Sequence, residues 1–259
     1  MIWRPIAPRY AWVKRGFDLA AGAALLLLSL PAIAIAWAAV RLTSDGPGFY
    51  SQTRVGRHGR VFHIYKLRTM THDCEARSGV RWATRHDFRV TPLGWVLRKL
   101  HVDELPQLWN ILCGEMSLIG PRPERPEFVG PFLQSISGYA ERLQVRPGLT
   151  GLAQIQLPPD SCIESVQRKL VLDRCYVDRL GASLDLRILA GTVVYLLGLS
   201  YAGVRDLVRL PNPLVDGSLN EAGRPEAQSD TVIDSMDSNK TVVLRAPVKP
   251  SSPDRQGTD

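Results

Sequence analysis

An uninterrupted apolar segment dominates the N-terminal part of the chain. From Leu19 to Val40 every residue is apolar or small, and none is charged. Roughly 20 such residues can cross a bilayer as a helix. The segment is too long for a cleaved signal peptide and has no convincing cleavage site. A buried core helix is disfavoured because the segment lacks a polar face. We therefore expect a membrane helix over residues 14–43, preceded by an N-terminal segment, 1–13.

Two features of this segment favour a bend over a straight span. Pro31 removes one helix hydrogen bond near the middle, and Ser29 is placed to bond a carbonyl that this frees. Basic residues precede the segment at Lys14 and Arg15 and follow it from Arg41 onwards, and positive charge favours the cytoplasmic side. We expect a re-entrant helix-break-helix that returns to the face it entered. A spanning helix with a tolerated proline is the alternative.

The pattern after residue 44 predicts a second, mainly α domain over residues 44–213. Two alternating segments around a Gly56–Gly59 turn predict a small β-hairpin. Gly114–Gly120 and Arg146–Gly151 carry loop residues. The last helical segment is mildly amphipathic, which suits an interfacial helix, although a core helix fits nearly as well. The expected strands are 49–55 and 60–65, and the expected helices are 74–77, 93–100, 105–112, 128–142 with a break near Gly138, 161–179 and 184–204.

Charge and composition change after residue 213. Residues 216–259 hold five Lys/Arg and eight Asp/Glu, a net charge of −3, whereas residues 1–215 hold 27 and 17, a net charge of +10. Because Pro, Ser, Asp, Gly and Asn dominate the end of the chain, we expect a disordered tail over 214–259. The basic body suits an anionic partner, but no nucleic-acid-binding signature is present. The four cysteines form no zinc-binding pattern, and we expect them to be reduced.

Adjacent carboxylates at Asp103 and Glu104 precede Pro106, which suits the first turn of a helix. Asp103 then lies at or just ahead of the helix N-terminus, where negative charge is favoured. A phosphoryl group would be favoured by the same field. Taken alone, such a pair most often caps a helix, so only the surrounding motifs can indicate chemistry.

Those motifs occur in a specific order, and together they resemble one family. After the apolar segment with its proline come Lys66–Met70, Leu97–Asn110, Gly114–Glu124 and Arg146–Gln154. From about Lys14 to about Ala202 the chain closely resembles the bacterial sugar transferases, which are monotopic phosphoglycosyl transferases. It resembles their short form, without an added N-terminal multispan region. It departs from the family pattern at Ile155–Asp160, where a Gly-Arg turn is common, and this bears on sugar or nucleotide specificity.

The resemblance implies a reaction at the cytoplasmic face of the bacterial inner membrane. A UDP-sugar would give its sugar-1-phosphate to undecaprenyl phosphate and release UMP, which primes synthesis of exopolysaccharide, capsule, O-antigen or a glycoconjugate. Asp103 would attack the β-phosphorus and form an aspartyl-phosphate-sugar intermediate, since a carboxylate is a competent nucleophile. Glu104 would help to hold Mg²⁺, which neutralises the diphosphate. Phosphate-binding candidates are the basic residues Lys66, Arg68, Arg98, Arg122 and Arg146.

Several alternatives stay open from the sequence alone. Lys66 and Arg68 could be ordinary solvated charges, and Arg98 could simply neutralise helix charge. Asp173 and Asp185 match acidic positions of the family, but a structural role fits as well. The rival function is a membrane-anchored, non-catalytic binding module. The expected partners are the UDP-sugar, undecaprenyl phosphate and membrane phospholipids, with no nucleic acid. The donor sugar, the pathway, the tail's role and whether the chain forms a homodimer are not specified by the sequence.

Overall fold

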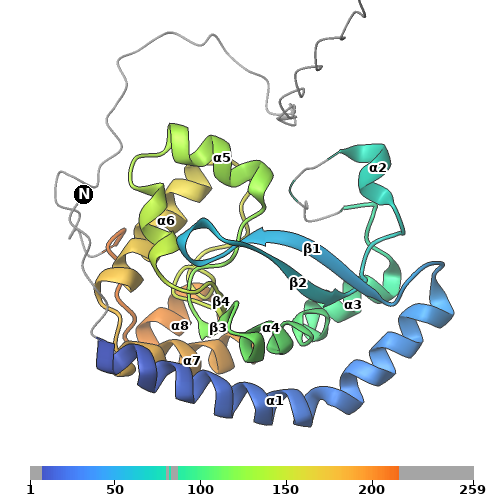
Figure 1. Ribbon diagram of the computed structural model, residues 1–259, viewed down its shortest axis with the longest axis horizontal. Coiled ribbons are helices and arrows are strands. Elements are labelled where there is room, and N and C mark those ends of the chain that lie inside the picture. Colours follow the sequence, from blue (N-terminus) through green and yellow to red (C-terminus); the bar gives the residue numbers. More distant parts are fainter. Residues whose placement is uncertain (1–7, 80–81, 83–86, 216–259) are drawn as a thin grey trace, which may run out of the picture.

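The computed structural model describes residues 8–79, 82 and 87–215 of the 259 residues. This part is mainly helical, with one long apolar N-terminal helix and two small two-stranded sheets, as expected for the fold class. Helix α1 lies along the base of the molecule and the remaining elements lie above it (Figure 1). Most of the expected tail, 214–259, lies outside the described residues. The helices are α1 Pro8–Thr43, α2 Cys74–Ser78, α3 Pro92–Lys99, α4 Gln107–Cys113, α5 Pro126–Ser135, α6 Ile163–Asp178, α7 Ala182–Leu196 and α8 Tyr201–Leu207.

The expected hairpin is confirmed by strands β1, Phe49–Val55, and β2, Val61–Leu67. They pair antiparallel, with Phe49 opposite Leu67 and Val55 opposite Val61. The turn between them contains His58 at φ 57° and Gly59 at φ 76°. Glycine is well suited to this left-handed conformation, so the turn residues account for the register of the hairpin.

Helix α1 continues through Pro31 without the interruption that the sequence predicts. It bends near its middle (Figure 1), which is the usual consequence of a proline inside a helix. The Ser29 hydroxyl donates to the carbonyl of Leu26 at 3.0 Å, and not to that of Leu27, whose hydrogen bond Pro31 removes. The helix also begins at Pro8, earlier than the expected residue 14.

Both halves of α1 pack against the rest of the protein. In the first half, Asp18 is buried and its carboxylate accepts hydrogen bonds from Ser117 Oγ and Leu118 N, both at 3.0 Å. In the second half, Ala36 and Val40 pack in one apolar cluster with Leu67 and Leu97, from β2 and α3. The two sides of the bend therefore contact the same domain.

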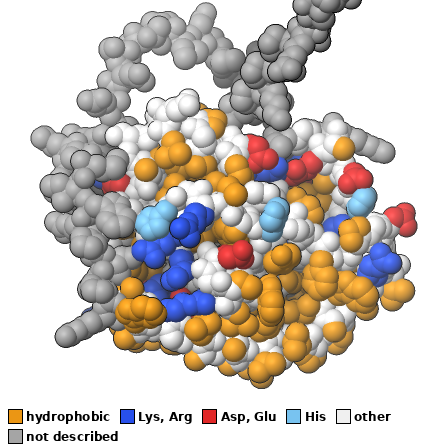
Figure 2. All heavy atoms as spheres, viewed as in Figure 1, with side chains coloured by type: hydrophobic (Ala, Val, Ile, Leu, Met, Phe, Trp, Pro, Cys, Tyr) orange, Lys and Arg blue, Asp and Glu red, His pale blue; other side chains and the backbone are white. Residues whose placement is uncertain are grey.

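Much of the remaining surface of α1 is apolar and exposed. The helix is long and apolar enough to cross a membrane, and only 17% of its most apolar stretch is buried. Figure 2 shows hydrophobic side chains gathered along the lower edge of the molecule, where α1 lies. Trp95, Trp109 and Leu197 of the neighbouring helical segments are also exposed. This distribution suits contact with lipid.

Two further parts of the fold differ from the sequence-based expectation. Loops were expected at Gly114–Gly120 and Arg146–Gly151, but they contain strands β3, Ser117–Ile119, and β4, Gly148–Thr150, which pair in parallel. The single helix expected over 184–204 is wrong: α7 and α8 are separate. Gly198 at φ 97° ends the first, and Ser200 caps the second by accepting from Gly203 N at 3.2 Å.

Candidate active site

The site forms where strand β2 of the hairpin is hydrogen-bonded to α4. The side chain that makes these bonds is that of Asn110, which is fully buried. Its Nδ2 donates to His63 O and to Glu115 Oε2, both at 2.7 Å, and its Oδ1 accepts from Tyr65 N at 3.2 Å. These bonds hold β2 beside α4 and so place Lys66, the next residue along β2, next to the acids that precede the helix.

Asp103 and Glu104 lie in a 3-10 turn, Val102–Glu104, just ahead of α4. The turn follows His101 at φ 57°. Neither this turn nor α4 has a side-chain cap hydrogen bond. The acids therefore precede the helix, as expected, without serving as its cap. The capping interpretation does not account for the pair.

Glu104 is held between two cations. Its Oε1 lies 2.6 Å from Lys66 Nζ and 2.6 Å from Arg122 Nη2, and Arg122 Nη1 is 3.4 Å from Oε2. Burial alone would raise the pKa of Glu104, but Arg122 and Lys66 hold this pKa well below its usual range. Glu104 is consequently a fixed negative charge at neutral pH.

Asp103 is buried, with 6% of its surface exposed. Burial and the neighbouring Glu104 raise its pKa, while Lys66, Arg98 and Arg122 act in the opposite direction. Among the described residues its carboxylate accepts no hydrogen bond. A partly desolvated carboxylate without a hydrogen-bonded partner has the character of a nucleophile, whereas the ion-paired Glu104 does not.

Arg98 precedes the acids in the sequence and Arg122 follows them, and the positive charge of each acts to lower the pKa of Asp103. The Nε of Arg98 donates to Thr69 Oγ1 at 2.8 Å, which orients the guanidinium. Arg122 lies between two prolines, as the sequence shows, and its own carbonyl accepts from Arg142 Nη2 at 2.9 Å. Both side chains are therefore positioned and are not freely solvated charges.

Arg68 and Arg146 lie elsewhere. Because β2 ends at Leu67, Arg68 no longer follows the alternation that would place it beside Lys66. Its Nη2 donates instead to the carbonyl and hydroxyl of Ser44, at the end of α1. Arg146 donates to Gly114 O at 2.9 Å, where α4 ends. The substrate-binding role expected for these two residues stays a prediction, and their contacts are structural.

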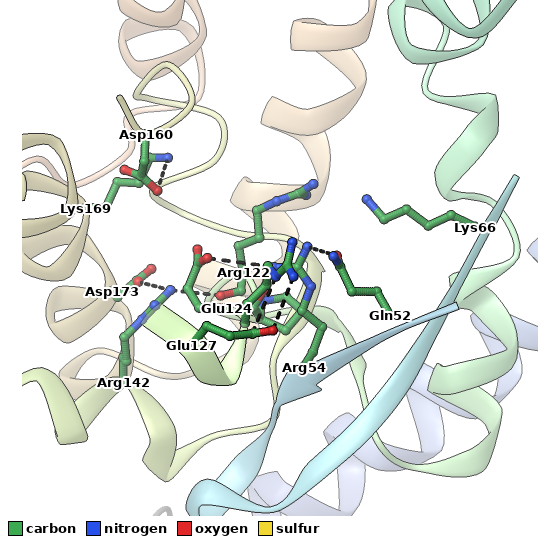
Figure 3. A network of polar contacts seen from close by, with 12 residues as sticks. Gln52, Arg54, Lys66, Arg122, Glu124, Glu127, Arg142, Asp160, Lys169 and Asp173 are labelled. Carbon is green, nitrogen blue, oxygen red and sulfur yellow. Dashed lines mark hydrogen bonds and ion pairs between the residues drawn. The ribbon is translucent and has the colours of Figure 1, made fainter. Parts of the chain in front are cut away.

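A buried ion pair that the sequence does not predict lies next to Arg122. Arg142 Nη2 lies 2.9 Å from Asp173 Oδ2, and both side chains are almost fully buried. Because α6 carries Asp173, this pair joins the α6 side of the molecule to the loop of Arg122 (Figure 3). No local pattern relates positions 142 and 173, so only the folded chain reveals the pair. Asp185 has a structural role, since it bonds Tyr10, Lys14 and Tyr176.

The acid pair offers the type of donor that Mg²⁺ prefers. Mg²⁺ is usually held by one or two carboxylates together with substrate phosphates and water. Asp103 and Glu104 can supply the carboxylates, although the described residues contain no group of three or more His, Cys, Asp or Glu side chains that could hold a metal ion by itself. Lys66 and Arg122 already neutralise Glu104. The residues therefore fit a metal that takes most of its ligands from a bound diphosphate.

The sequence is similar to known proteins over most of its length. Residues 9–198 match the family described as bacterial sugar transferase. The chain is 40% identical over 187 residues to a UDP-N-acetylgalactosamine-undecaprenyl-phosphate N-acetylgalactosaminephosphotransferase of Aeromonas hydrophila, covering 72% of this chain and 44% of the relative. The chain thus spans less than half the length of that relative.

Two further relatives are of more similar size. A UDP-glucose:undecaprenyl-phosphate glucose-1-phosphate transferase of Caulobacter vibrioides is 42% identical over 186 residues, covering 71% of this chain and 69% of the relative. An exopolysaccharide production protein of Rhizobium leguminosarum is 36% identical over 187 residues, covering 70% of this chain and 94% of the relative.

Proposed function

Because the chain belongs to the bacterial sugar transferase family, we propose that it transfers a sugar-1-phosphate from a UDP-sugar to undecaprenyl phosphate and releases UMP. The observation that carries the proposal is the buried Asp103 beside an ion-paired Glu104. The names of the relatives supply the two substrates. A non-catalytic anchored module would have no need of a desolvated carboxylate among cations, so the enzyme is the better interpretation.

The proposed reaction has two displacements at one phosphorus. The Asp103 carboxylate attacks the β-phosphorus of the UDP-sugar, and the bond from that phosphorus to the bridging oxygen breaks, so UMP leaves with its electron pair. An oxygen of undecaprenyl phosphate then attacks the aspartyl-phosphate-sugar, and the carboxylate is restored. Arg122 and Lys66 place positive charge beside the transferred phosphoryl group, where positioning and charge neutralisation matter most.

A metal dependence follows from the acid pair. Mg²⁺, held by Glu104 and by oxygens of the diphosphate, would neutralise charge on the leaving UMP. We expect EDTA to abolish UMP release and added Mg²⁺ to restore it, measured with undecaprenyl phosphate and a panel of UDP-sugars. Turnover that is indifferent to chelation would remove the metal from the proposal. No UMP release from any UDP-sugar would favour the anchored binding module.

We infer that α1 is re-entrant and that the active site faces the cytoplasm. A helix of 36 residues is about 54 Å long at 1.5 Å per residue, longer than the roughly 30 Å of bilayer hydrocarbon. Asp18 and Val40, on opposite sides of Pro31, nevertheless contact the same domain. A straight span would carry one of these contacts across the membrane. A bent helix inserted from one side keeps both.

Cysteine labelling tests this topology. In a variant without the native cysteines, we expect Val13→Cys and Asp45→Cys, at exposed positions before and after the apolar segment, to react with a membrane-impermeant maleimide from the cytoplasmic side only. Inverted and right-side-out vesicles distinguish the two sides. Labelling of the two positions from opposite sides would establish a through-span and refute the re-entrant arrangement.

A further inference from the structure

Arginine side chains from separate parts of the chain gather where α4 ends, whereas the acid pair precedes the start of that helix. Arg15 of α1 donates from Nη1 to Ile111 O at 2.6 Å and from Nη2 to Leu112 O at 2.9 Å. Arg146 donates from Nε to Gly114 O at 2.9 Å. The carbonyls at the end of a helix carry partial negative charge, so they hold both arginines in place.

The turn of the hairpin adds two more arginines. Arg57 Nε donates to Gln144 O at 3.0 Å, two residues before Arg146, and Arg60 directly follows the turn and is exposed. Burial lowers the pKa of Arg146, and the positive charges of Arg15 and Arg57 lower it further. The hairpin turn, the start of β4 and the first half of α1 therefore bring like charges together. We call Arg15, Arg57, Arg60 and Arg146 the basic patch.

The positive charge of the basic patch is not balanced by acids. None of its members forms an ion pair with a described residue. Asp18 opposes the other charges in their effect on the pKa of Arg146, but it is a single carboxylate against four cations. The Nη atoms of Arg57 and Arg146 donate to no described residue and are open to solvent. Such a cluster attracts an anion and offers it accessible donors.

The position of the basic patch favours an anion of the membrane surface. Arg15 follows Trp12 by three residues on α1, so both lie on one face of the helix, and Trp12 is 78% exposed. Tryptophan is enriched where membrane meets water. Figure 2 shows Lys and Arg side chains gathered directly above the hydrophobic lower edge, on the side where α1 begins. The diphosphate of the donor, by contrast, would meet Lys66 and Arg122 ahead of the start of α4.

We propose that the basic patch binds the phosphate of an anionic phospholipid of the cytoplasmic leaflet. The proposal goes beyond the transfer reaction, and it rests on the membrane placement of α1 inferred above. The guanidinium groups of Arg57 and Arg146 bind the phosphate oxygens bidentately, and Arg15 and Arg60 add attraction for the negative surface. The bound lipid holds the hairpin turn against the membrane. Because β2 continues from this turn to Lys66, the lipid also fixes the orientation of the active site relative to the bilayer.

Native mass spectrometry of the full chain in detergent micelles tests the binding directly. We expect discrete adducts with added phosphatidylglycerol and far fewer with phosphatidylcholine, which has a phosphate but no net charge. In Arg57→Gln/Arg60→Gln the affinity for phosphatidylglycerol should fall about thirtyfold, because each basic residue near an anionic surface contributes about fivefold. Arg57→Lys/Arg60→Lys keeps both charges and should retain most of the affinity, since lysine also binds phosphate. The control is Arg168→Glu, at an exposed position on α6, which makes the same change in net charge and should bind as the wild type does.

Four results would overturn the proposal. Equal binding of the two lipids by the wild type, or an equal loss in Arg168→Glu, would exclude a site for anionic lipid. Unchanged binding in Arg57→Gln/Arg60→Gln would exclude the basic patch. An equal loss in the lysine variant would assign the effect to the hydrogen bond between Arg57 and Gln144. Weaker binding of UDP by the glutamine variant, with lipid binding unchanged, would assign the patch to the nucleotide. Because lipid binding is measured without a UDP-sugar, its outcome is independent of whether the proposed reaction occurs.

Discussion

Replacing Asp103 by Asn is expected to abolish release of UMP from every UDP-sugar. The amide has nearly the same shape but is a very poor nucleophile, so the first displacement has no attacking group. Removal of a covalent nucleophile elsewhere has cost up to about 10⁶-fold in kcat, and we expect at least about 10³-fold here. The wild type should also retain a radiolabelled sugar-phosphate after denaturation in the absence of acceptor, and the variant should not.

The matched control is Asp178→Asn, at an exposed position near the end of α6. It makes the same change of charge away from the site, so its UMP release should equal that of the wild type. Circular dichroism should show that both variants are folded. Turnover of Asp103→Asn within tenfold of the wild type would refute the nucleophile assignment, and Glu104 would become the next residue to test.

The second large effect is expected from Gly148→Ala. A Cβ at Gly148 would lie 2.0 Å from Gly120 N and 2.4 Å from Thr150 O, both backbone atoms. Gly148 N also donates to Pro121 O at 2.9 Å, directly before Arg122. Overpacking costs about 1–3 kcal/mol, and we expect the upper end because backbone atoms cannot rotate away. The free energy of unfolding should fall accordingly, with a loss of UMP release as Arg122 moves.

Gly130→Ala is the same substitution as Gly148→Ala, and we expect it to have the opposite effect on stability. Gly130 lies within α5, and an added Cβ would have no atom within 4 Å. Alanine in a helix interior is favoured over glycine by about 0.5–1 kcal/mol. Denaturant titration should therefore show a small stabilisation in Gly130→Ala and a clear loss in Gly148→Ala. Equal changes in the free energy of unfolding would mean that the close approach of the backbone between β3 and β4 does not determine the cost of a side chain at Gly148.

The elements that depend on residues close together in the sequence were predictable from the sequence. The hairpin follows from alternation around Gly56–Gly59, and the position of Asp103 and Glu104 ahead of a helix follows from Pro106. Strands β3 and β4 were missed because each has three residues. Their pairing depends on contact between two glycine-bearing segments about 30 positions apart, and no local period signals it.

The candidate site also contains residues that the sequence identifies and residues that only the folded chain brings together. Arg122 is a phosphate-binding candidate through the family resemblance, and the sequence also places it between two prolines. Arg68 belongs with Lys66 to the motif Lys66–Met70, but β2 ends at Leu67 and Arg68 donates instead to Ser44. The Arg142–Asp173 pair was not identified as a pair, because the two positions meet only after α6 packs against the turn Tyr139–Gln144.

The hydrogen bonds of Asp18 have a consequence for how the protein is made. Asp18 leaves the ribosome 99 residues before Ser117, its partner in β3. At about 5–20 residues per second, the first helix waits roughly 5–20 s before that partner exists. During this interval the carboxylate of Asp18, at the start of a long apolar segment, lacks its partners in β3. Bilayer insertion would then precede completion of the fold, and the growing chain would assemble its active site on a helix already held by lipid.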